Sequence, residues 1–299
     1  MWHSFLQVFF DRYEYPKAGA DYLLELVAHL SEDSYLRQLL AQKFDDYISG
    51  RIQTLADVNA LLEEIKAAAE AENVPWESAQ FLFFLLCMQP LKVQYDRMHL
   101  PEDYYAGVAR DLRSKLNECY AVKGIWGSFV APWFAGFFAM TRFVIGRLQY
   151  EIIQMPDCIS TDGKYCFHGQ TAVNMHIPSG CPLDMEQVHA SMAEAAVFFA
   201  RHFPDGKVLF HCNSWLLFPG HYEMLPPDSR IRQFMDEFTI IRSNIDQNKS
   251  DLWRIFNTFE TDDPAKLPQE TALQRAYVQW LQSGKPIGDG IGIRYYPKS

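Results

Sequence analysis

The chain has 299 residues, a net charge of −10 and six cysteines. This length suits two domains, and an apolar content of 48% allows each domain a filled core. The acidic balance and the lack of a basic run exclude a nucleic-acid partner, because affinity for DNA or RNA rests on Lys and Arg neutralising phosphates. Six cysteines in a chain this long do not form a disulfide framework.

One apolar stretch, residues 124–141, carries no charged side chain and approaches the length of a membrane span. Pro132, Ser128 and several glycines interrupt it, so we expect a helix buried between two domains and no membrane insertion. The N-terminus is apolar but has no basic leader, which argues against a secretion signal. We therefore expect a cytoplasmic protein.

Residues 17–120 read as helices throughout. Segments with apolar residues at helical spacing follow one another, and Thr54, Pro75 and Pro101 mark helix starts. The run 81–88 is apolar all round and is expected at the centre of this domain. No strand pattern or histidine cluster interrupts the region, so we interpret it as a scaffold.

The sequence pattern changes near residues 138–146, and the second half is expected to be mixed α/β. Residues 142–154 are rich in β-branched and aromatic residues and are predicted as one strand. Further elements are predicted as strands at 239–243 and 291–296, the latter at a sheet edge, and as helices at 251–259 and 270–282. The fold class is therefore α+β, with an all-helical domain at 1–138 and a mixed sheet domain at 139–299.

The segment 171–218 reads as strand, loop, helix and strand. Apolar and polar residues alternate in its first part, with Asn174 and His176 on the polar face, as in a half-buried strand. Residues 207–218 are predicted as a second strand, apolar on both faces at first, as a central parallel strand would be. Such a unit implies two parallel strands and a ligand-binding end where the first strand meets the helix.

Three motifs follow one another in the second half: Gly146-Arg-Leu-Gln-Tyr-Glu, His176-Ile-Pro-Ser-Gly-Cys-Pro-Leu and His211-Cys-Asn-Ser-Trp-Leu-Leu. They resemble the recurring motifs of bacterial proteins that join a helical N-acyltransferase N-terminal domain to a GNAT-like C-terminal domain. The resemblance covers essentially the whole chain. It implies a mixed sheet whose two central parallel strands splay apart around acetyl-CoA or another acyl-CoA.

The function implied by this resemblance is transfer of an acyl group, most simply acetyl, from acyl-CoA to an amine on a small molecule or peptide by direct attack. The alternative is a non-catalytic GNAT-like module that binds a ligand or a partner protein. The loop 178–184 motivates the alternative. Better-known GNAT enzymes hold the pyrophosphate with a Gln/Arg-x-x-Gly-x-Gly/Ala loop, whereas this loop has two prolines without N–H groups and ends in Asp184.

N-acyl transfer needs a base for the amine, a donor for the thioester carbonyl and an acid for the thiolate. His211 is the first candidate base, because histidine has an ordinary pKa of about 6.5. His176, at the end of the first strand beside the loop, is a similar candidate, and Glu151 is the other candidate base. Ser214 is a candidate donor to the carbonyl or the thiolate. Tyr222 is the acid that the resemblance implies.

Each of these candidates has a structural alternative. His211 would instead be a structural histidine bonded to a neighbouring carbonyl, and Glu151 would form an ion pair with Arg147. Ser214 would satisfy a backbone group at the end of the strand. The sequence leaves these readings open.

The candidate cofactor-binding residues lie around the loop and after the second strand. They are His176, Ser179, Gly180, Cys181 and Trp215. Trp215 would form a wall of the acyl pocket, or it would be an ordinary core tryptophan.

A zinc site or a cysteine nucleophile would be a different kind of functional site. A zinc site from Cys158, Cys166, His168 and His176 has irregular spacing and no Cys-x-x-Cys pair, so no metal is predicted. Cys212 follows its neighbouring histidine directly within a strand, where adjacent side chains point to opposite faces. That alternation argues against a Cys–His pair.

Overall fold

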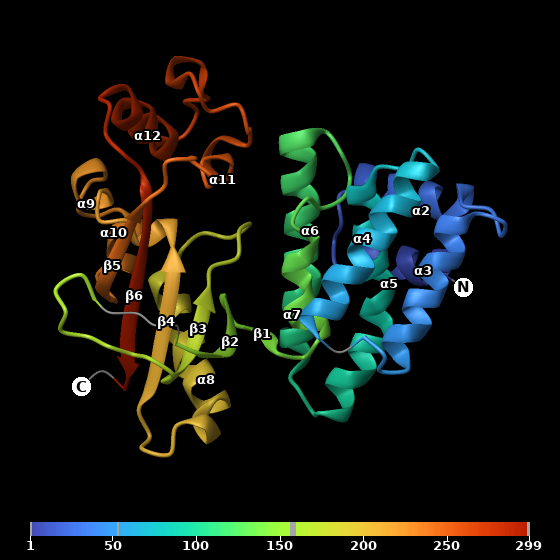
Figure 1. Ribbon diagram of the computed structural model, residues 1–299, viewed down its shortest axis with the longest axis horizontal. Coiled ribbons are helices and arrows are strands. Elements are labelled where there is room, and N and C mark those ends of the chain that lie inside the picture. The colour runs from blue at the N-terminus through green and yellow to red at the C-terminus, as the bar shows by residue number, and fades with distance from the viewer. Residues whose placement is uncertain (1, 53, 156–159, 298–299) are drawn as a thin grey trace. The chain divides into compact units, whose positions relative to one another are not determined.

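A computed structural model describes residues 2–52, 54–155 and 160–297. The chain divides into two compact units, Met1–Phe143 and Val144–Ser299. The first unit is helical and the second contains most of a six-stranded mixed sheet (Figure 1). The predicted α+β fold class, with a helical half before a mixed sheet, is therefore confirmed.

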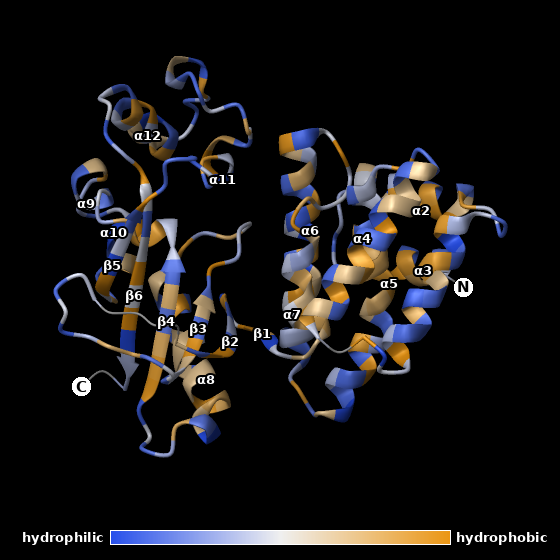
Figure 2. Cartoon of the chain, viewed as in Figure 1, coloured by the Kyte–Doolittle hydropathy of each residue, from blue (hydrophilic) through white to orange (hydrophobic). Residues whose placement is uncertain are grey.

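The helical unit is built around a buried central helix. Its long helices within the described residues are α1 (Trp2–Arg12), α2 (Lys17–His29), α3 (Tyr35–Ile48), α4 (Leu55–Ala71), α5 (Trp76–Arg97) and α6 (Glu102–Lys123). Thr54 caps α4 in a capping box with Asp57, and Pro75 precedes α5, as predicted. All of residues 81–88 in α5 are buried, which confirms them as core (Figure 2). Helix α1 lies before residues 17–120, where individual helices were predicted, but within the helical domain predicted at 1–138.

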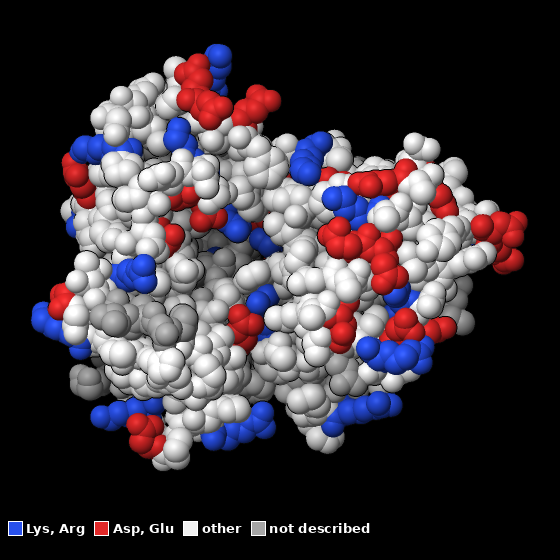
Figure 3. All heavy atoms as spheres, viewed as in Figure 1, with Lys and Arg blue, Asp and Glu red and all other residues white. Residues whose placement is uncertain are grey.

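The surface of this unit carries acidic and basic side chains close together on the face drawn in Figure 3. Exposed pairs include Lys17–Asp21 at 2.7 Å and Arg12–Glu102 at 2.8 Å. Exposed pairs of this kind contribute little to stability. The helices therefore depend on the buried apolar side chains for their packing.

The apolar stretch 124–141 is not a single helix. Gly124 ends α6 in the left-handed conformation, with φ of 69°. The chain then forms the 3₁₀ turn η1 (Ala131–Phe134) and the short helix α7 (Ala135–Phe138), both within the helical unit. The expected helix between two domains is therefore wrong. None of the described helices combines the length and apolarity that crossing a membrane requires.

The sheet has the strand order β1-β2-β3-β4-β6-β5. Its strands are β1 (Arg142–Ile145), β2 (Leu148–Gln154), β3 (Thr171–His176), β4 (Val208–Ser214), β5 (Thr239–Ile245) and β6 (Gly288–Tyr296). The single strand predicted at 142–154 is wrong, because Gly146 adopts φ of 59° and turns the chain between β1 and β2. The edge position predicted for 291–296 is also wrong, since β6 pairs with both β4 and β5.

Strands β3 and β4 are parallel, as predicted. Their registered pairs are Val173–Phe210 and Asn174–His211, and both strands continue beyond these pairs. Strands that stop pairing while they continue must diverge. Strand β4 ends earlier than the predicted residue 218, because the chain turns there into the 3₁₀ helix η3 (Trp215–Leu217).

The second unit also has helices and 3₁₀ turns. They are α8 (Met185–Phe198), η2 (Ala200–His202), α9 (His221–Met224), α10 (Arg230–Met235), α11 (Trp253–Phe256), η4 (Pro264–Lys266) and α12 (Ala272–Gln282). Of these, α8 packs against β2 and α11 packs against α12. Ser191 of α8 bonds the Tyr150 hydroxyl at 2.8 Å and donates to the Ile145 carbonyl at 2.5 Å. Helix α8 therefore covers the face of the sheet that carries Tyr150 and Phe210, and the polar side chains of β2, β3 and β4 lie on the other face.

Candidate active site

Four polar side chains lie together across three neighbouring strands, and we call them the polar cluster: Glu151, Asn174, His176 and His211. The register places Glu151 of β2 opposite Asn174 of β3, and Asn174 opposite His211 of β4. His176 lies two residues beyond Asn174 and therefore on the same face of β3. The alternation predicted for this strand is confirmed, because Val173 and Met175 are fully buried on the other face.

Hydrogen bonds join the members of the polar cluster. His176 Nε2 lies 2.7 Å from Glu151 Oε1, and Asn174 Nδ2 donates to the same oxygen at 3.2 Å. His211 Nδ1 lies 2.8 Å from Asn174 Oδ1. Amide and carboxylate oxygens only accept, so His211 donates through Nδ1 and His176 through Nε2. In the neutral ring of His176 the lone pair then lies on Nδ1.

Burial distinguishes the two histidines. His211 is buried, and desolvation, together with the nearby His176, lowers its pKa to about 4. It is therefore neutral at pH 7. The side chains of His176 and Glu151 remain 20% and 16% exposed. A histidine held by a carboxylate is well suited to accept a proton, because the carboxylate orients the ring and stabilises its charged form.

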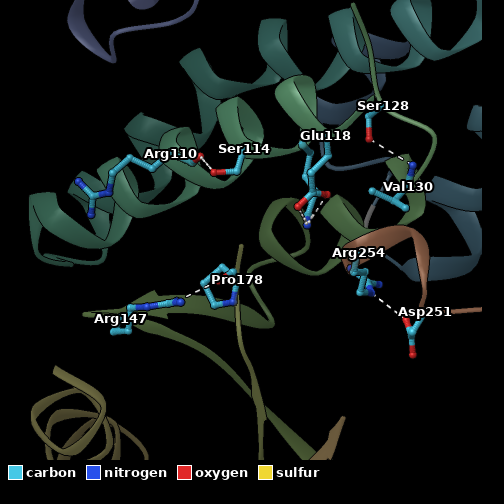
Figure 4. A network of polar contacts seen from close by, with 10 residues as sticks. Arg110, Ser114, Glu118, Ser128, Val130, Arg147, Pro178, Asp251 and Arg254 are labelled. Carbon is cyan, nitrogen blue, oxygen red and sulfur yellow. Dashed lines mark hydrogen bonds and ion pairs between the residues drawn. The ribbon is translucent and has the colours of Figure 1, made fainter. Parts of the chain in front are cut away.

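Arg147 holds the loop between β3 and α8. Its guanidinium donates to the carbonyl oxygens of Pro178, Cys181 and Pro182 at 2.9, 2.8 and 3.0 Å. Figure 4 shows the bond to Pro178. These bonds use the planar fork of arginine to fix backbone rather than a carboxylate, and the alternative of a Glu151–Arg147 ion pair is not formed.

The loop itself carries three of the predicted cofactor-binding residues, Ser179, Gly180 and Cys181, all of which are exposed. Gly180 has φ of 86°, a conformation that favours glycine. Beyond the loop, the N-terminus of α8 is already capped, because Asp184 accepts a bond from the Gln187 backbone N–H at 3.0 Å. A phosphate at this helix end would meet that carboxylate.

Ser214 and Trp215 make contacts away from the polar cluster. The Ser214 hydroxyl accepts from the Leu216 backbone N–H at 3.2 Å and caps η3. It thus satisfies a backbone group at the end of the strand, the structural role considered for it from the sequence. Trp215 packs edge-on against His221 and Tyr277, with ring centroids 5.9 and 6.2 Å apart. It borders an apolar cluster between η3, α11 and α12.

Tyr222, the predicted acid, lies in α9 and donates to Asp236 Oδ1 at 2.8 Å. Burial and this carboxylate raise its pKa to about 12. A raised pKa weakens the hydroxyl as an acid near neutral pH.

Cysteine chemistry finds no geometric support in the sheet. Cys212 is fully buried on the face opposite its neighbouring histidine, and desolvation raises its pKa to about 12. Among the described residues, no three His, Cys, Asp or Glu side chains are grouped so that they could hold a metal ion. Cys158, one of the zinc ligands considered, lies outside the described residues.

Sequence reasoning missed Gln149. This residue stands in β2 directly opposite His176 and two residues before Glu151, so its side chain belongs to the same face as the polar cluster. It is fully buried, and neither Nε2 nor Oε1 has a hydrogen-bond partner among the described residues. It is part of the first recurring motif, and counting back by two from Glu151 would have found it.

Comparisons with known proteins agree with this architecture. A family model for a GNAT-like C-terminal domain matches residues 143–294, and one for an N-acyltransferase N-terminal domain matches residues 4–140. A search of the curated proteins found no match.

Solved structures of acyltransferases are similar over almost the whole chain. One, in complex with decanoyl-CoA and teicoplanin, is 22% identical with a TM-score of 0.75, covering 97% of this chain and 87% of that one. A second, with decanoyl-CoA, is 23% identical with a TM-score of 0.73, covering 96% and 86%. A third, with CoA and 10C-teicoplanin, is 22% identical with a TM-score of 0.73 and the same coverage, 96% and 86%. The chain belongs to the family of proteins that join an N-acyltransferase N-terminal domain to a GNAT-like C-terminal domain.

Proposed function

We propose that the protein transfers an acyl group from acyl-CoA to an amine on a small molecule or peptide. The observation that carries this proposal is the His176–Glu151 pair, which lies beside the point where β3 and β4 stop pairing. The fold family implies that acyl-CoA binds between these two strands. A base at this point would lie beside the thioester.

In this reaction the amine nitrogen attacks the carbonyl carbon of the thioester. A C–N bond forms, and His176, oriented by Glu151, takes the proton that the nitrogen loses. The tetrahedral intermediate then collapses and the C–S bond breaks. The leaving thiolate takes the proton that His176 accepted from the amine, so the ring returns to its neutral form. The products are an amide and CoA with a free thiol.

His211 has a different part in this proposal from the one expected from the sequence. A histidine with a pKa of about 4 is a weak base at neutral pH. Its Nδ1–H instead holds Asn174, whose amide donates to Glu151. His211 is therefore a positioning residue, and the base is His176.

The comparisons support the classes of donor and acceptor. Decanoyl-CoA in the similar structures supports an acyl chain longer than acetyl. Two of the similar structures contain a teicoplanin glycopeptide, as teicoplanin itself or as 10C-teicoplanin, which supports a peptide-like acceptor.

Calorimetric titration with acetyl-CoA, octanoyl-CoA and decanoyl-CoA tests the donor. We expect all three to bind and the longest chain to bind most tightly, because each buried CH₂ contributes about 0.8 kcal/mol. If none binds at millimolar concentration, acyl transfer is rejected in favour of a module that binds another ligand or a partner protein.

A further inference from the structure

Gln149 presents a buried carboxamide that is not hydrogen-bonded to any of the described residues. Its relative exposure is 0%, and both Nε2 and Oε1 lack a hydrogen-bond partner among the described residues. Buried polar side chains are normally paired, because desolvating an amide without a partner costs stability. An unpaired one on the face of a candidate active site points to a ligand that supplies the missing partners.

The place of Gln149 in the sheet indicates which part of a ligand it would meet. It is the cross-strand partner of His176, and side chains so paired have Cβ atoms roughly 4.5–5.5 Å apart. A carbonyl carbon attacked by an amine that His176 deprotonates would lie beside both side chains. The oxygen of that carbonyl gains negative charge during attack and needs a donor.

The other donors of the polar cluster have partners within it. His176 Nε2–H and Asn174 Nδ2–H are bonded to Glu151, and His211 Nδ1–H is bonded to Asn174. Glu151 itself only accepts. The amide N–H groups of Gln149, which are buried on this face and unpaired among the described residues, are therefore available to a substrate.

We propose that Gln149 is a catalytic residue that binds the reacting centre of the acyl donor, donating through Nε2 to the thioester carbonyl oxygen. This assignment rests on the proposed acyl transfer. Oε1 of the same carboxamide accepts the N–H that the attacking amine keeps after losing one proton to His176. Bond formation and cleavage are those of the transfer itself, and Gln149 exchanges no proton.

The test compares decanoyl-CoA with S-decyl-CoA, a thioether in which a CH₂ group replaces the thioester carbonyl. Calorimetry on the full chain measures both affinities for the wild type, for Gln149→Leu and for Gln149→Met, which has a similar length without polar atoms. Gln154→Leu is the matched control, because Gln154 lies in the same strand but is exposed. Thermal unfolding identifies which of the variants are folded.

We expect the wild type and Gln154→Leu to bind decanoyl-CoA about five-fold more tightly than S-decyl-CoA, the worth of one neutral hydrogen bond. The Gln149 variants should bind both ligands with the affinity of the thioether. If the wild type binds the two ligands equally, the inference is overturned without any variant. It is also overturned if either Gln149 variant is folded and still binds decanoyl-CoA more tightly than S-decyl-CoA. If the wild type binds neither ligand, it is the proposed acyl transfer that fails.

Discussion

His176 Nε2 lies 2.7 Å from Glu151 Oε1, and this contact joins β3 to β2 through side chains as well as through the backbone ladder. Glu151 Oε1 also accepts from Asn174, which in turn accepts from His211. The four side chains thus orient one another. Replacing one member should therefore disturb the others.

Glu151→Gln removes the charge that orients and stabilises His176 while keeping the shape of the side chain. We expect hydrolysis of decanoyl-CoA, in which water takes the place of the amine and decanoate is released, to slow by about 10²–10⁴-fold, the usual contribution of a positioned base. Release of free thiol measures the rate. Glu186→Gln, an exposed glutamate in the first turn of α8, is the control and should keep the wild-type rate. A Glu151→Gln rate within two-fold of wild type would exclude this role.

The stability of the fold should depend on pH through His211. Its pKa is lowered from 6.5 to about 4, so the unfolded chain binds a proton in this interval that the folded chain does not. The contribution of His211 to the free energy of unfolding is therefore fully present above about pH 6.5. It decreases by roughly 3 kcal/mol as the pH falls to 4. His221, whose pKa is also lowered to about 4 by burial, acts in the same direction.

Urea unfolding of the wild type and of His211→Gln between pH 4 and 7 measures this dependence. Glutamine keeps a donor for Asn174 but does not titrate, so the variant should lose less stability on acidification. Parallel curves for the two proteins would show that His211 is not the group responsible.

Arg147→Lys should loosen the loop between β3 and α8. Lysine keeps the charge but cannot reproduce three donors in a fixed plane, so the carbonyls of Pro178, Cys181 and Pro182 lose partners. We expect faster amide hydrogen exchange at residues 179–181. Arg242→Lys, at an exposed position of β5, should leave that exchange unchanged. Unchanged exchange in Arg147→Lys would mean that other contacts fix the loop.

Asp184→Asn removes the negative charge at the N-terminus of α8 but keeps a side-chain oxygen that can cap the helix. Asparagine caps a helix about as well as aspartate, so stability should change by less than about 0.5 kcal/mol. Removing the carboxylate should tighten CoA binding about two- to five-fold, the worth of one charge near a helix N-terminus. Asp205→Asn, another aspartate that accepts a local backbone bond, is the control. An unchanged Kd for CoA in Asp184→Asn would place the pyrophosphate away from this helix end.

Tyr222→Phe tests the acid that the family resemblance implies. The hydroxyl is bonded to Asp236 and its pKa is raised to about 12, so we expect its loss to leave the rate of thioester cleavage within two-fold of wild type. A larger loss in the same thiol-release assay would restore Tyr222 as the acid.

Local signals in the sequence were sufficient for much of the fold. The caps at Thr54 and Asp184 and the alternation around Asn174 depend on residues close in the chain, and the structure confirms them. The position of β6 between β4 and β5 and the turn at Gly146 were not foreseen. Strand order depends on contacts between distant segments, and a single glycine within a β-rich stretch does not reveal its φ.

The sequence predicted individual residues of the candidate site but not which of them contact one another. Glu151, His176 and His211 were each singled out, yet the pairing of His176 with Glu151 depends on the register between β2 and β3. Register fixes which side chains meet, and the sequence of one strand alone does not contain it. The face that Gln149 occupies could have been predicted from its spacing to Glu151, but only the structure shows that its carboxamide has no hydrogen-bond partner among the described residues.

The most direct test is the single-turnover hydrolysis of decanoyl-CoA by the wild type and by His176→Asn, in which water takes the place of the amine. The Kd for decanoyl-CoA is measured on the same samples. We expect the variant to bind decanoyl-CoA as the wild type does but to cleave it about 10²–10⁴-fold more slowly. Equal rates in the two proteins would contradict the assignment of His176 as the base.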